Sequence, residues 1–390
     1  MLGDVRWQDN TGMTIHRRHF SIATSAALVA GLTPALPARA QDTKLVLGQS
    51  AAFTGPAAQL GIQFYQGAKL YFDKLNAQGG VLGRQIEIRN LDDGYEPERC
   101  AENTRKLLAD DVFALFGYIG TPTSVAALPL TTQAKVPFIA PFTGAMALRE
   151  PFNRYAFHLR ASYNDETALI VKQLTSLGLK KIGVCYQNDA YGKAGLDGMN
   201  LALGTQSLKP VALGTFERNT VEVTAAVKAL TAATPEAIVQ IGAYKACAAF
   251  IRAARKAGYG GTFYNVSFVG TQALADELGK EGAGIVVSQV MPSPYNAARP
   301  IAREFVDAVK AGPKEGSANF SSMEGYLAAR MLTEGLKRGG KPTRDALMTG
   351  LESLANVSWG GFQVDMSPKD HVASSFVELS MLTGDGRVRT

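Results

Sequence analysis

The segment from residue 112 to residue 144 contains the same pattern twice, an apolar run of strand length followed by a polar turn. Val112 to Phe116 leads into the turn Gly117 to Thr123, where a helix is expected to begin, and Val136 to Ala140 leads into Pro141 to Gly144. In an open parallel sheet, loops at the carboxyl ends of strands line the ligand crevice, and helix amino termini there offer free N–H groups to an anion. These two loops are the predicted centre of a binding site.

Strand and helix patterns alternate along the chain, which predicts an α/β fold with two doubly wound lobes and parallel sheets. Residues 145–164 interrupt the alternation and separate the two lobes. Three helical patterns, at 301–311, 321–338 and 343–354, precede a predicted terminal hairpin of 362–365 with 374–382. The predicted strands are 44–49, 85–91, 112–116, 136–140, 181–186, 211–216, 237–241, 262–266 and 284–289.

The first forty residues have the pattern of an export signal. Arg17-Arg18 precede an apolar stretch from Ile22 to Leu36, which ends at the small-x-small cleavage pattern Ala38-Arg39-Ala40. The apolar stretch is too short to span a bilayer. The arginine pair resembles the twin-arginine form, so both that route and the general export route stay open. We expect cleavage near Ala40 and a mature chain in the periplasm.

The composition excludes several classes of function. Removing the four basic and two acidic residues of the first forty lowers the formal net charge from +6 to +4, and no basic cluster is interleaved with aromatics, so no nucleic-acid surface is expected. Cys100, Cys185 and Cys247 are far apart and favour buried free thiols over one disulfide. Only His158 and His371 follow the signal, which argues against a histidine metal site or catalytic relay.

Enzyme motifs are incomplete. No GxGxxG follows the first strand, and Ser50 lacks the closing glycine of a nucleophile elbow. Gly335 to Lys341 nearly matches a phosphate loop, but Pro342 replaces the hydroxyl that binds magnesium. The pair Asp92-Asp93 is typical of cap and turn residues more than of paired catalytic acids. We therefore expect no enzyme activity, no catalytic residue, no cofactor and no metal.

Six segments carry a family resemblance through their order and spacing. Together they resemble the exported solute-binding proteins of ABC importers of the branched-chain amino acid type, the Leu/Ile/Val-binding group, over residues 43–385. The segments are Phe53-Thr54-Gly55-Pro56, NAQGGVLGR at 76–84, Asp92-Asp93 with Pro97, Gly117 to Ser124, Val136-Pro137 and Tyr191-Gly192.

The resemblance implies a type I periplasmic-binding-protein-like fold, in which two lobes joined by three crossovers close over one ligand. It implies that lobe I comprises residues 41–162 and 291–356, and that lobe II comprises residues 163–290 and 357–390.

The resemblance also implies roles for particular residues. The hydroxyl of Thr121 matches a group that holds a ligand α-carboxylate, the loop of Phe142, Thr143 and Gly144 matches one that contacts the ligand, and Tyr191 and Tyr244 match aromatics that cover it. Gly144 falls where amino-acid binders often have threonine.

Ser267 is a departure, because it stands in the place of the acid that pairs with the ligand α-ammonium. Either another acid such as Asp189 or Glu166 takes that role, or the ligand has no ammonium. Two alternatives are open for Arg160: it binds the ligand carboxylate, or it forms a structural ion pair between the lobes.

These features predict a non-enzymatic receptor that delivers a small amino-acid-like or carboxylate solute to an ABC permease. A receptor for an aromatic acid, amide or urea is the alternative among binding proteins, and a sensory ligand-binding module is the alternative outside transport. The expected partners are an amino acid or organic acid and the permease membrane subunits, with no nucleic acid, and the chain is expected to be a monomer.

Overall fold

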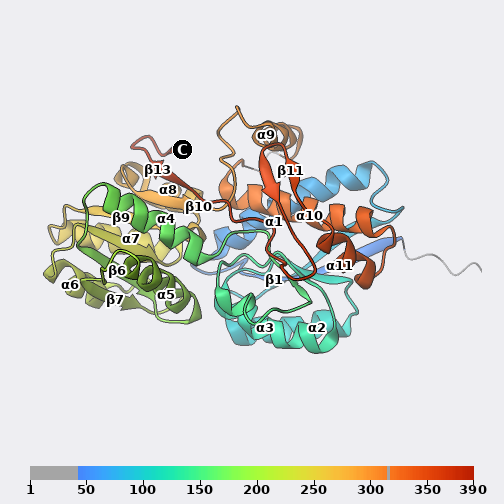
Figure 1. Cartoon of the computed structure of the whole chain (residues 1–390), viewed down its shortest axis with the longest axis horizontal. Helices are drawn as coiled ribbons and strands as arrows, with labels where there is room; N and C mark the ends of the chain where they lie inside the picture. The colour runs from blue at the N-terminus through green and yellow to red at the C-terminus, as the bar shows by residue number, and fades with distance from the viewer. Residues whose placement is uncertain (1–42, 314–316) are drawn as a thin grey trace, which may run out of the picture. The chain divides into compact units, whose positions relative to one another are not determined.

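The computed structural model describes residues 43–313 and 317–390 (Figure 1). The export signal predicted for residues 1–40 lies outside these residues. Within the described residues, no helix is both long and apolar enough to cross a bilayer. The strands form a five-stranded sheet, a seven-stranded sheet and a separate two-stranded hairpin.

The first sheet is entirely parallel, with the strand order β2-β1-β3-β4-β5. Helix α1 packs on α10 and α2 packs on α3, and Figure 1 shows β1 between these two pairs. The order of strands reverses beside β1, which is where α/β sheets bind ligands. The elements are β1 (Lys44–Ala51), α1 (Ala58–Ala77), β2 (Gln85–Asp92), α2 (Pro97–Ala109), β3 (Ala114–Phe116), α3 (Thr121–Ala134), β4 (Phe138–Ile139) and β5 (Ala156–Phe157).

The second sheet has five parallel strands in the order β10-β9-β8-β6-β7, and β13 and β14 extend it antiparallel beyond β10. Its order reverses beside β6. The elements are α4 (Tyr163–Ser176), β6 (Ile182–Gln187), α5 (Ala190–Gly204), β7 (Ala212–Phe216), α6 (Thr224–Ala232), β8 (Ala237–Ile241), α7 (Tyr244–Lys256), β9 (Thr262–Asn265), α8 (Thr271–Leu278), β10 (Val286–Gln289), β13 (Glu378–Leu382) and β14 (Val388–Arg389).

Three helices follow β10 and return to the first sheet. They are α9 (Pro300–Ala311), α10 (Phe320–Gly339) and α11 (Arg344–Glu352). Helix α10 starts at a capping box, in which Asn319 and Ser322 bond each other's backbone, and ends at the left-handed Gly340. Most of its residues are buried, because α1 and α11 both pack along it.

We call the first sheet with α1–α3 and α9–α11 lobe I, and the second sheet with α4–α8 lobe II. The chain passes between them three times: after β5, after β10 and before β13. The predicted class, two doubly wound α/β lobes with parallel sheets, is confirmed. The segment 145–164, which the sequence left without a strand, contains the short 3₁₀ helix Met146–Leu148 and the edge strand β5.

The predicted terminal hairpin is wrong. Residues 374–382 do contain a strand, β13, but it pairs with β10 and β14. The segment at 362–365 forms β12 (Phe362–Val364), which makes a hairpin with β11 (Val357–Trp359), because Gly360 and Gly361 both have positive φ and close a two-residue turn between them. It lies against lobe I: the amide of Ile301 donates to the Gly360 carbonyl, and the Arg330 guanidinium covers Trp359 at 5.2 Å.

Residues 371–373 also bond to the strand end at His158 in lobe I. We therefore place the return of the chain to lobe II after residue 373, instead of at the predicted residue 357.

Two glycines allow α1 and α10 to approach each other at backbone distance. A Cβ on Gly67 would lie 1.8 Å from the Ser322 carbonyl oxygen, and a Cβ on Gly325 would lie 1.9 Å from that of Phe64. Neither contact can relax through a side-chain rotation, because each involves backbone atoms. The spacing of these helices therefore depends on the absence of both side chains.

Gly325→Ala is expected to lower the free energy of unfolding by about 1–3 kcal/mol, as overpacked cores do, although alanine is the better helix former. The matched control is Gly204→Ala at the end of α5, where nothing lies within 4 Å of the added Cβ and a gain of up to about 1 kcal/mol is expected. Urea unfolding of both variants measures the difference. Equal effects of the two substitutions would contradict the close packing.

Candidate functional site

The predicted site residues follow the carboxyl ends of parallel strands in both sheets. Thr121 opens α3 after β3, and Phe142, Thr143 and Gly144 follow β4. In lobe II, Tyr191 lies in the first turn of α5 after β6, Tyr244 opens α7 after β8, and Ser267 follows β9. The fold therefore brings all seven to the sheet edges where α/β proteins bind ligands.

Three hydroxyl groups meet at the amino terminus of α3. The Thr121 and Thr143 hydroxyl oxygens are 2.6 Å apart, and the Thr143 hydroxyl donates to the phenol oxygen of Tyr163 at 3.4 Å. All three residues are buried. Because the first N–H groups of a helix have no partner inside it, this cluster adds hydroxyl donors to a site that already favours an anion.

Tyr163 explains the glycine at position 144. Its amide donates to the Gly144 carbonyl, and a Cβ on residue 144 would lie 2.6 Å from the Tyr163 nitrogen and 2.8 Å from its ring. A threonine does not fit here, so the hydroxyl on this loop comes from Thr143. Arg149 holds the same loop, since its guanidinium donates to the carbonyls of Thr143 and Gly144 and to those of residues 160 and 161.

Phe268 joins the aromatic residues of the two lobes. Its ring centroid lies 4.5 Å from that of Tyr191 and 5.8 Å from those of Phe142 and Tyr95. Tyr191 also lies 5.4 Å from Tyr163. The Tyr191 hydroxyl is buried without a hydrogen-bond partner among the described residues, and burial raises the pKa of this phenol well above its usual value. A buried unpaired donor is costly, so this hydroxyl is suited to an acceptor on a ligand.

Tyr244 lies apart from this aromatic group. None of the ring pairs among the described residues that include Phe268, Phe142 or Tyr191 involves it. Burial raises the pKa of Tyr244, and a backbone hydrogen bond from Gln59 on α1 opposes this shift.

Arg160 forms a buried ion pair. Its guanidinium donates to both Glu324 carboxylate oxygens, at 2.8 and 2.7 Å, and lies over the Phe142 ring at 4.0 Å. Burial disfavours the charge on Arg160, but the attraction and hydrogen bonds of Glu324 outweigh it and raise the pKa of the guanidinium. Of the two alternatives for Arg160, the ion pair is present, but it joins the passage after β5 to α10 of lobe I instead of joining the two lobes.

Ser267 is bonded to charged neighbours. Its amide and hydroxyl donate to the Glu166 carboxylate at 2.7 and 3.0 Å, Ser288 donates to the same carboxylate at 2.5 Å, and Arg160 donates to the Ser267 hydroxyl at 3.1 Å. Burial raises the pKa of Glu166, and Arg160 together with the serine donors opposes that shift. Glu166 therefore places a carboxyl group directly behind the position where the sequence lacks an acid.

The space beside these residues is small. A cavity lined by Phe142, Arg160, Ser267 and Glu324 has a volume of about 10 Å³, roughly what a single water molecule needs. This space is too small for an amino acid or an organic acid.

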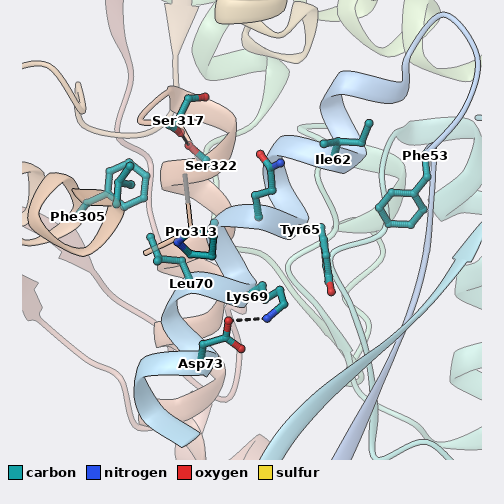
Figure 2. A pocket seen from close by; sticks show the side chains of 13 residues that line it. Phe53, Ile62, Tyr65, Lys69, Leu70, Asp73, Phe305, Pro313, Ser317 and Ser322 are labelled. Carbon is teal, nitrogen blue, oxygen red and sulfur yellow. Dashed lines mark hydrogen bonds and ion pairs between the residues drawn. The ribbon is translucent and has the colours of Figure 1, made fainter. Parts of the chain in front are cut away.

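A larger pocket of about 340 Å³ lies within lobe I, between α1 and α9 (Figure 2). Phe53, Tyr65, Leu70 and Phe305 contribute to its wall. Lys69 and Asp73 also line it but pair with each other at 2.5 Å, which leaves the wall largely apolar. None of the seven predicted site residues lines this pocket, so it is separate from the candidate site.

Asp92 and Asp93 are turn residues, as the sequence predicted. Asp92 accepts hydrogen bonds from the amides of Phe53, Thr54 and Gly94. Asp93 accepts from the Ser50 hydroxyl at 2.7 Å and from the Tyr95 amide at 2.8 Å. They hold the loop after β1 and the loop after β2 together at the edge of the first sheet.

Sequence reasoning missed Tyr163 and Phe268. Tyr163 follows Ser162, whose capping box with Asp165 starts α4. The S-x-x-D spacing is readable in the sequence and places Tyr163 in the first helical turn, but not beside Thr143. Phe268 follows Ser267 at the end of β9, and nothing in the local pattern separates it from a core phenylalanine. The three cysteines are buried free thiols, as predicted.

Asp93→Asn is expected to change how stability depends on pH. Burial raises the pKa of Asp93 from 3.8 to about 6, so between these values the folded state binds more protons than the unfolded state. This group's contribution to the free energy of unfolding therefore increases as pH falls. Urea unfolding at pH 7 and pH 4.5 should show wild type gaining about 2 kcal/mol relative to Asp93→Asn.

The neighbouring Asp92 is the control. Burial raises its pKa, but the hydrogen bonds from Thr54, Phe53 and Gly94 outweigh this and lower the pKa below its usual value. Its stabilising contribution is present above that usual value and is lost at lower pH. Asp92→Asn should therefore keep the gain between pH 7 and 4.5, and the same loss of pH dependence in both variants would contradict the assignment.

Glu324→Gln is expected to lower the free energy of unfolding by about 3–5 kcal/mol, because it leaves the buried Arg160 cation without its carboxylate. Glu87→Gln serves as the control, since its pair with Lys44 is exposed and worth within about 1 kcal/mol. Chemical denaturation compares the two. A cost for Glu324→Gln no larger than that for Glu87→Gln would show that Glu166 is sufficient to balance Arg160.

Comparisons with known proteins agree with this arrangement. Residues 44–386 match the model of a family described as periplasmic binding protein. The chain is 36% identical to a possible leucine/isoleucine/valine-binding protein from Rhodopirellula baltica SH 1, whose crystal structure it matches with a TM-score of 0.84 over 89% of this chain and 96% of that one. It is 24% identical to Leu/Ile/Val-binding protein homolog 7 of Brucella melitensis over 96% of both chains.

A third similar structure is a fatty acid ABC transporter substrate-binding protein from Thermomonospora curvata. It shares the fold, with a TM-score of 0.81 over 88% of this chain and 91% of that one, at 22% identity. The family match covers the whole first sheet and all of the second sheet except β14. The chain therefore belongs to the periplasmic binding protein family, whose members are solute-binding proteins and not enzymes.

Proposed function

We propose that this chain is the receptor of an ABC importer and that it captures a small carboxylate-bearing solute, amino-acid-like or a simple organic acid, between its two lobes. One observation carries the proposal. The hydroxyl groups of Thr121 and Thr143 from lobe I and of Tyr163 from lobe II meet at the amino terminus of α3. The Tyr191 ring packs on Tyr163, and its hydroxyl is buried without a partner among the described residues. A carboxylate offers acceptors for this set.

The proposed site binds an anion through neutral donors. Thr121 and Thr143 of lobe I and Tyr163 of lobe II supply hydroxyl groups beside the α3 N–H groups, and Tyr191 of lobe II supplies a fourth. Arg160 is not part of this donor set, because its guanidinium is already paired with the Glu324 carboxylate. Closure of the aromatic rings over the ligand excludes water, which strengthens each of these hydrogen bonds.

We further propose that the ligand has no α-ammonium group. Ser267 carries no charge, and the Glu166 carboxylate behind it already accepts three hydrogen bonds. Asp189 accepts from Gln187 and pairs with Arg218. An ammonium group without an ionic partner is costly to bury. A fatty acid, as in the name of the Thermomonospora protein, is a carboxylate without an ammonium group.

A branched-chain amino acid is the second candidate, favoured by the names of the Brucella and Rhodopirellula proteins. It requires Glu166 to accept a fourth donor through its remaining lone pair. The aromatic residues around Phe268 suit the side chain of either candidate, since both ligands have an apolar end.

Membership of the family implies a periplasmic location. We propose that residues 1–40 are the cleaved export signal that brings the chain there, by the twin-arginine or the general route. We also propose that the mature chain is a monomer and transfers its ligand to the membrane subunits of the permease.

Calorimetry and thermal unfolding with a matched pair of ligands test the proposal. 4-Methylpentanoate and leucine share an apolar skeleton and a carboxylate, and only leucine has an ammonium group. We expect 4-methylpentanoate, or a related acid from a screen, to bind more tightly, and at a hundred times its dissociation constant to stabilise the protein by about 2.7 kcal/mol, or roughly 5 °C. Tight binding of leucine with no binding of any des-amino acid would contradict the absence of an ammonium group.

Tyr191→Phe tests the role of the unpaired hydroxyl. We expect affinity for the acid to fall about tenfold or more, because a hydrogen bond to a charged group is lost, while the free protein keeps or gains stability. Tyr326→Phe is the control, since that hydroxyl bonds Glu304 at 3.0 Å on lobe I and should affect stability but not binding. Unchanged affinity in Tyr191→Phe would remove this residue from the site.

A further inference from the structure

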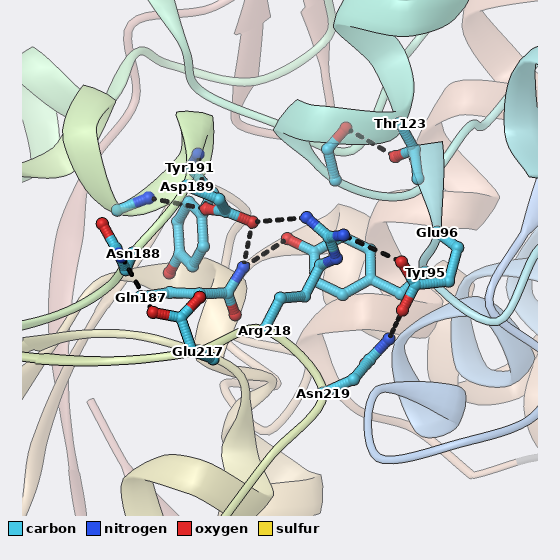
Figure 3. A network of polar contacts seen from close by, with 12 residues as sticks. Tyr95, Glu96, Thr123, Gln187, Asn188, Asp189, Tyr191, Glu217, Arg218 and Asn219 are labelled. Carbon is cyan, nitrogen blue, oxygen red and sulfur yellow. Dashed lines mark hydrogen bonds and ion pairs between the residues drawn. The ribbon is translucent and has the colours of Figure 1, made fainter. Parts of the chain in front are cut away.

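A group of polar side chains joins the two lobes beside the candidate site (Figure 3). Arg218, in the loop after β7 of lobe II, donates to the Glu96 carboxylate of lobe I at 2.8 Å. Its neighbour Asn219 donates to the other Glu96 oxygen at 2.7 Å and to the Gly94 carbonyl at 2.9 Å. We call Glu96, Asp189, Arg218 and Asn219 the latch.

The guanidinium of Arg218 also bonds an acid of lobe II that lies next to the candidate site residue Tyr191. It donates to the Asp189 carboxylate at 3.3 Å, and that carboxylate caps α5 by accepting from the amide of Tyr191 at 2.9 Å. Burial opposes the charge on Arg218, but the hydrogen bond and charge of Glu96, followed by those of Asp189, raise the pKa of the guanidinium. One cation therefore bridges an acid on each lobe.

The backbone on both sides is shaped for this contact. Asn219 has φ +60, a left-handed conformation that asparagine tolerates better than most residues. Gly94, whose carbonyl it bonds, has φ +57, and a Cβ there would lie 2.8 Å from the Arg99 guanidinium. Residues next to the latch reach the site, because Tyr95 packs on Phe268 and Tyr191 follows the Asp189 cap.

We propose that the latch holds the two lobes together without touching the ligand, so that Arg218, Asn219 and Glu96 are positioning residues for closure. The contact between lobes is a property of the free protein, and only its consequence for ligand retention rests on the proposed function. Arg218 faces two acids, Glu96 and Asp189, and Glu217 lies in the same loop and bonds Asn188. Without Arg218, uncompensated carboxylates remain on both lobes and repel each other.

The test measures lobe separation in the ligand-free full mature chain. Spin labels are attached to cysteines introduced at Ala134 on α3 and Ala225 on α6, two exposed positions on different lobes. The native cysteines are buried, which favours labelling at the introduced sites. Pulsed electron paramagnetic resonance then gives the distribution of distances between the two labels, and from it the fractions of molecules with a short and with a long distance.

We expect part of the wild-type molecules to show a short distance between the labels, which corresponds to the lobes being held together. The ratio of short to long distances should fall about fivefold in Glu96→Gln, the scale of one surface ion pair, and further in Arg218→Gln, where two acids lose their cation. Because the pairs are partly exposed, raising NaCl from 0.05 to 1 M should lower the ratio in wild type and much less in Arg218→Gln.

Arg252→Gln is the matched control. Arg252 also lies between two acids, Glu277 and Glu281, but all three are in lobe II. This variant should leave the distance distribution unchanged. The proposal is overturned if wild type shows no short-distance fraction, if Arg218→Gln matches wild type, or if Arg252→Gln opens the lobes equally. No ligand is added, so a wrong ligand class has no effect on this result.

Discussion

The buried ion pair of Arg160 with Glu324 holds the first passage between the lobes against the core of lobe I. Arg160 lies on the first passage from lobe I to lobe II, and Glu324 lies on α10, the most buried helix of lobe I. Through Ser267 the same guanidinium reaches Glu166 on α4. The arginine and the two carboxyl groups therefore hold three segments together: the passage after β5, helix α10, and the end of β9 beside α4. All three groups are buried, where an unpaired charge would be strongly destabilising.

This ion pair also determines the chemistry left to the site. With its arginine already paired, the site offers neutral hydroxyl and amide donors, and these are positioned by α/β geometry at strand ends. Thr121 and Thr143 owe their contact to the adjacency of β3 and β4 in the parallel sheet, and Tyr191 owes its place to the Asp189 cap of α5. The fold brings the donors together, and Thr121, Thr143, Tyr163 and Tyr191 are not among the residues with positive φ.

The sequence was sufficient for most of the fold, because strands such as Ala237–Ile241 and helices such as Phe320–Gly339 have clear apolar periods and caps. It was not sufficient where a strand is very short or where two neighbouring segments could each pair with the same strand. The two-residue strand β5 has no period to detect, and the Gly360-Gly361 turn pairs β12 with the preceding β11 instead of with residues 374–382. The sequence was sufficient to place the candidate site residues after strand ends. The contacts made by Phe268, Tyr163 and the paired Arg160 could not be predicted, because they depend on segments over a hundred residues apart or on a loop path that has no sequence signature.

The hairpin of β11 and β12 has a consequence for spectroscopy. The sequence has two tryptophans, Trp7 within the predicted signal and Trp359 in this hairpin. Trp359 is buried, lies under the Arg330 guanidinium and packs beside Phe362, all within lobe I. Intrinsic tryptophan emission from the mature chain therefore reports the local environment of one lobe. The proposed closure of the lobes over a solute would leave this indole in the same surroundings, so we expect its fluorescence to report unfolding and not binding.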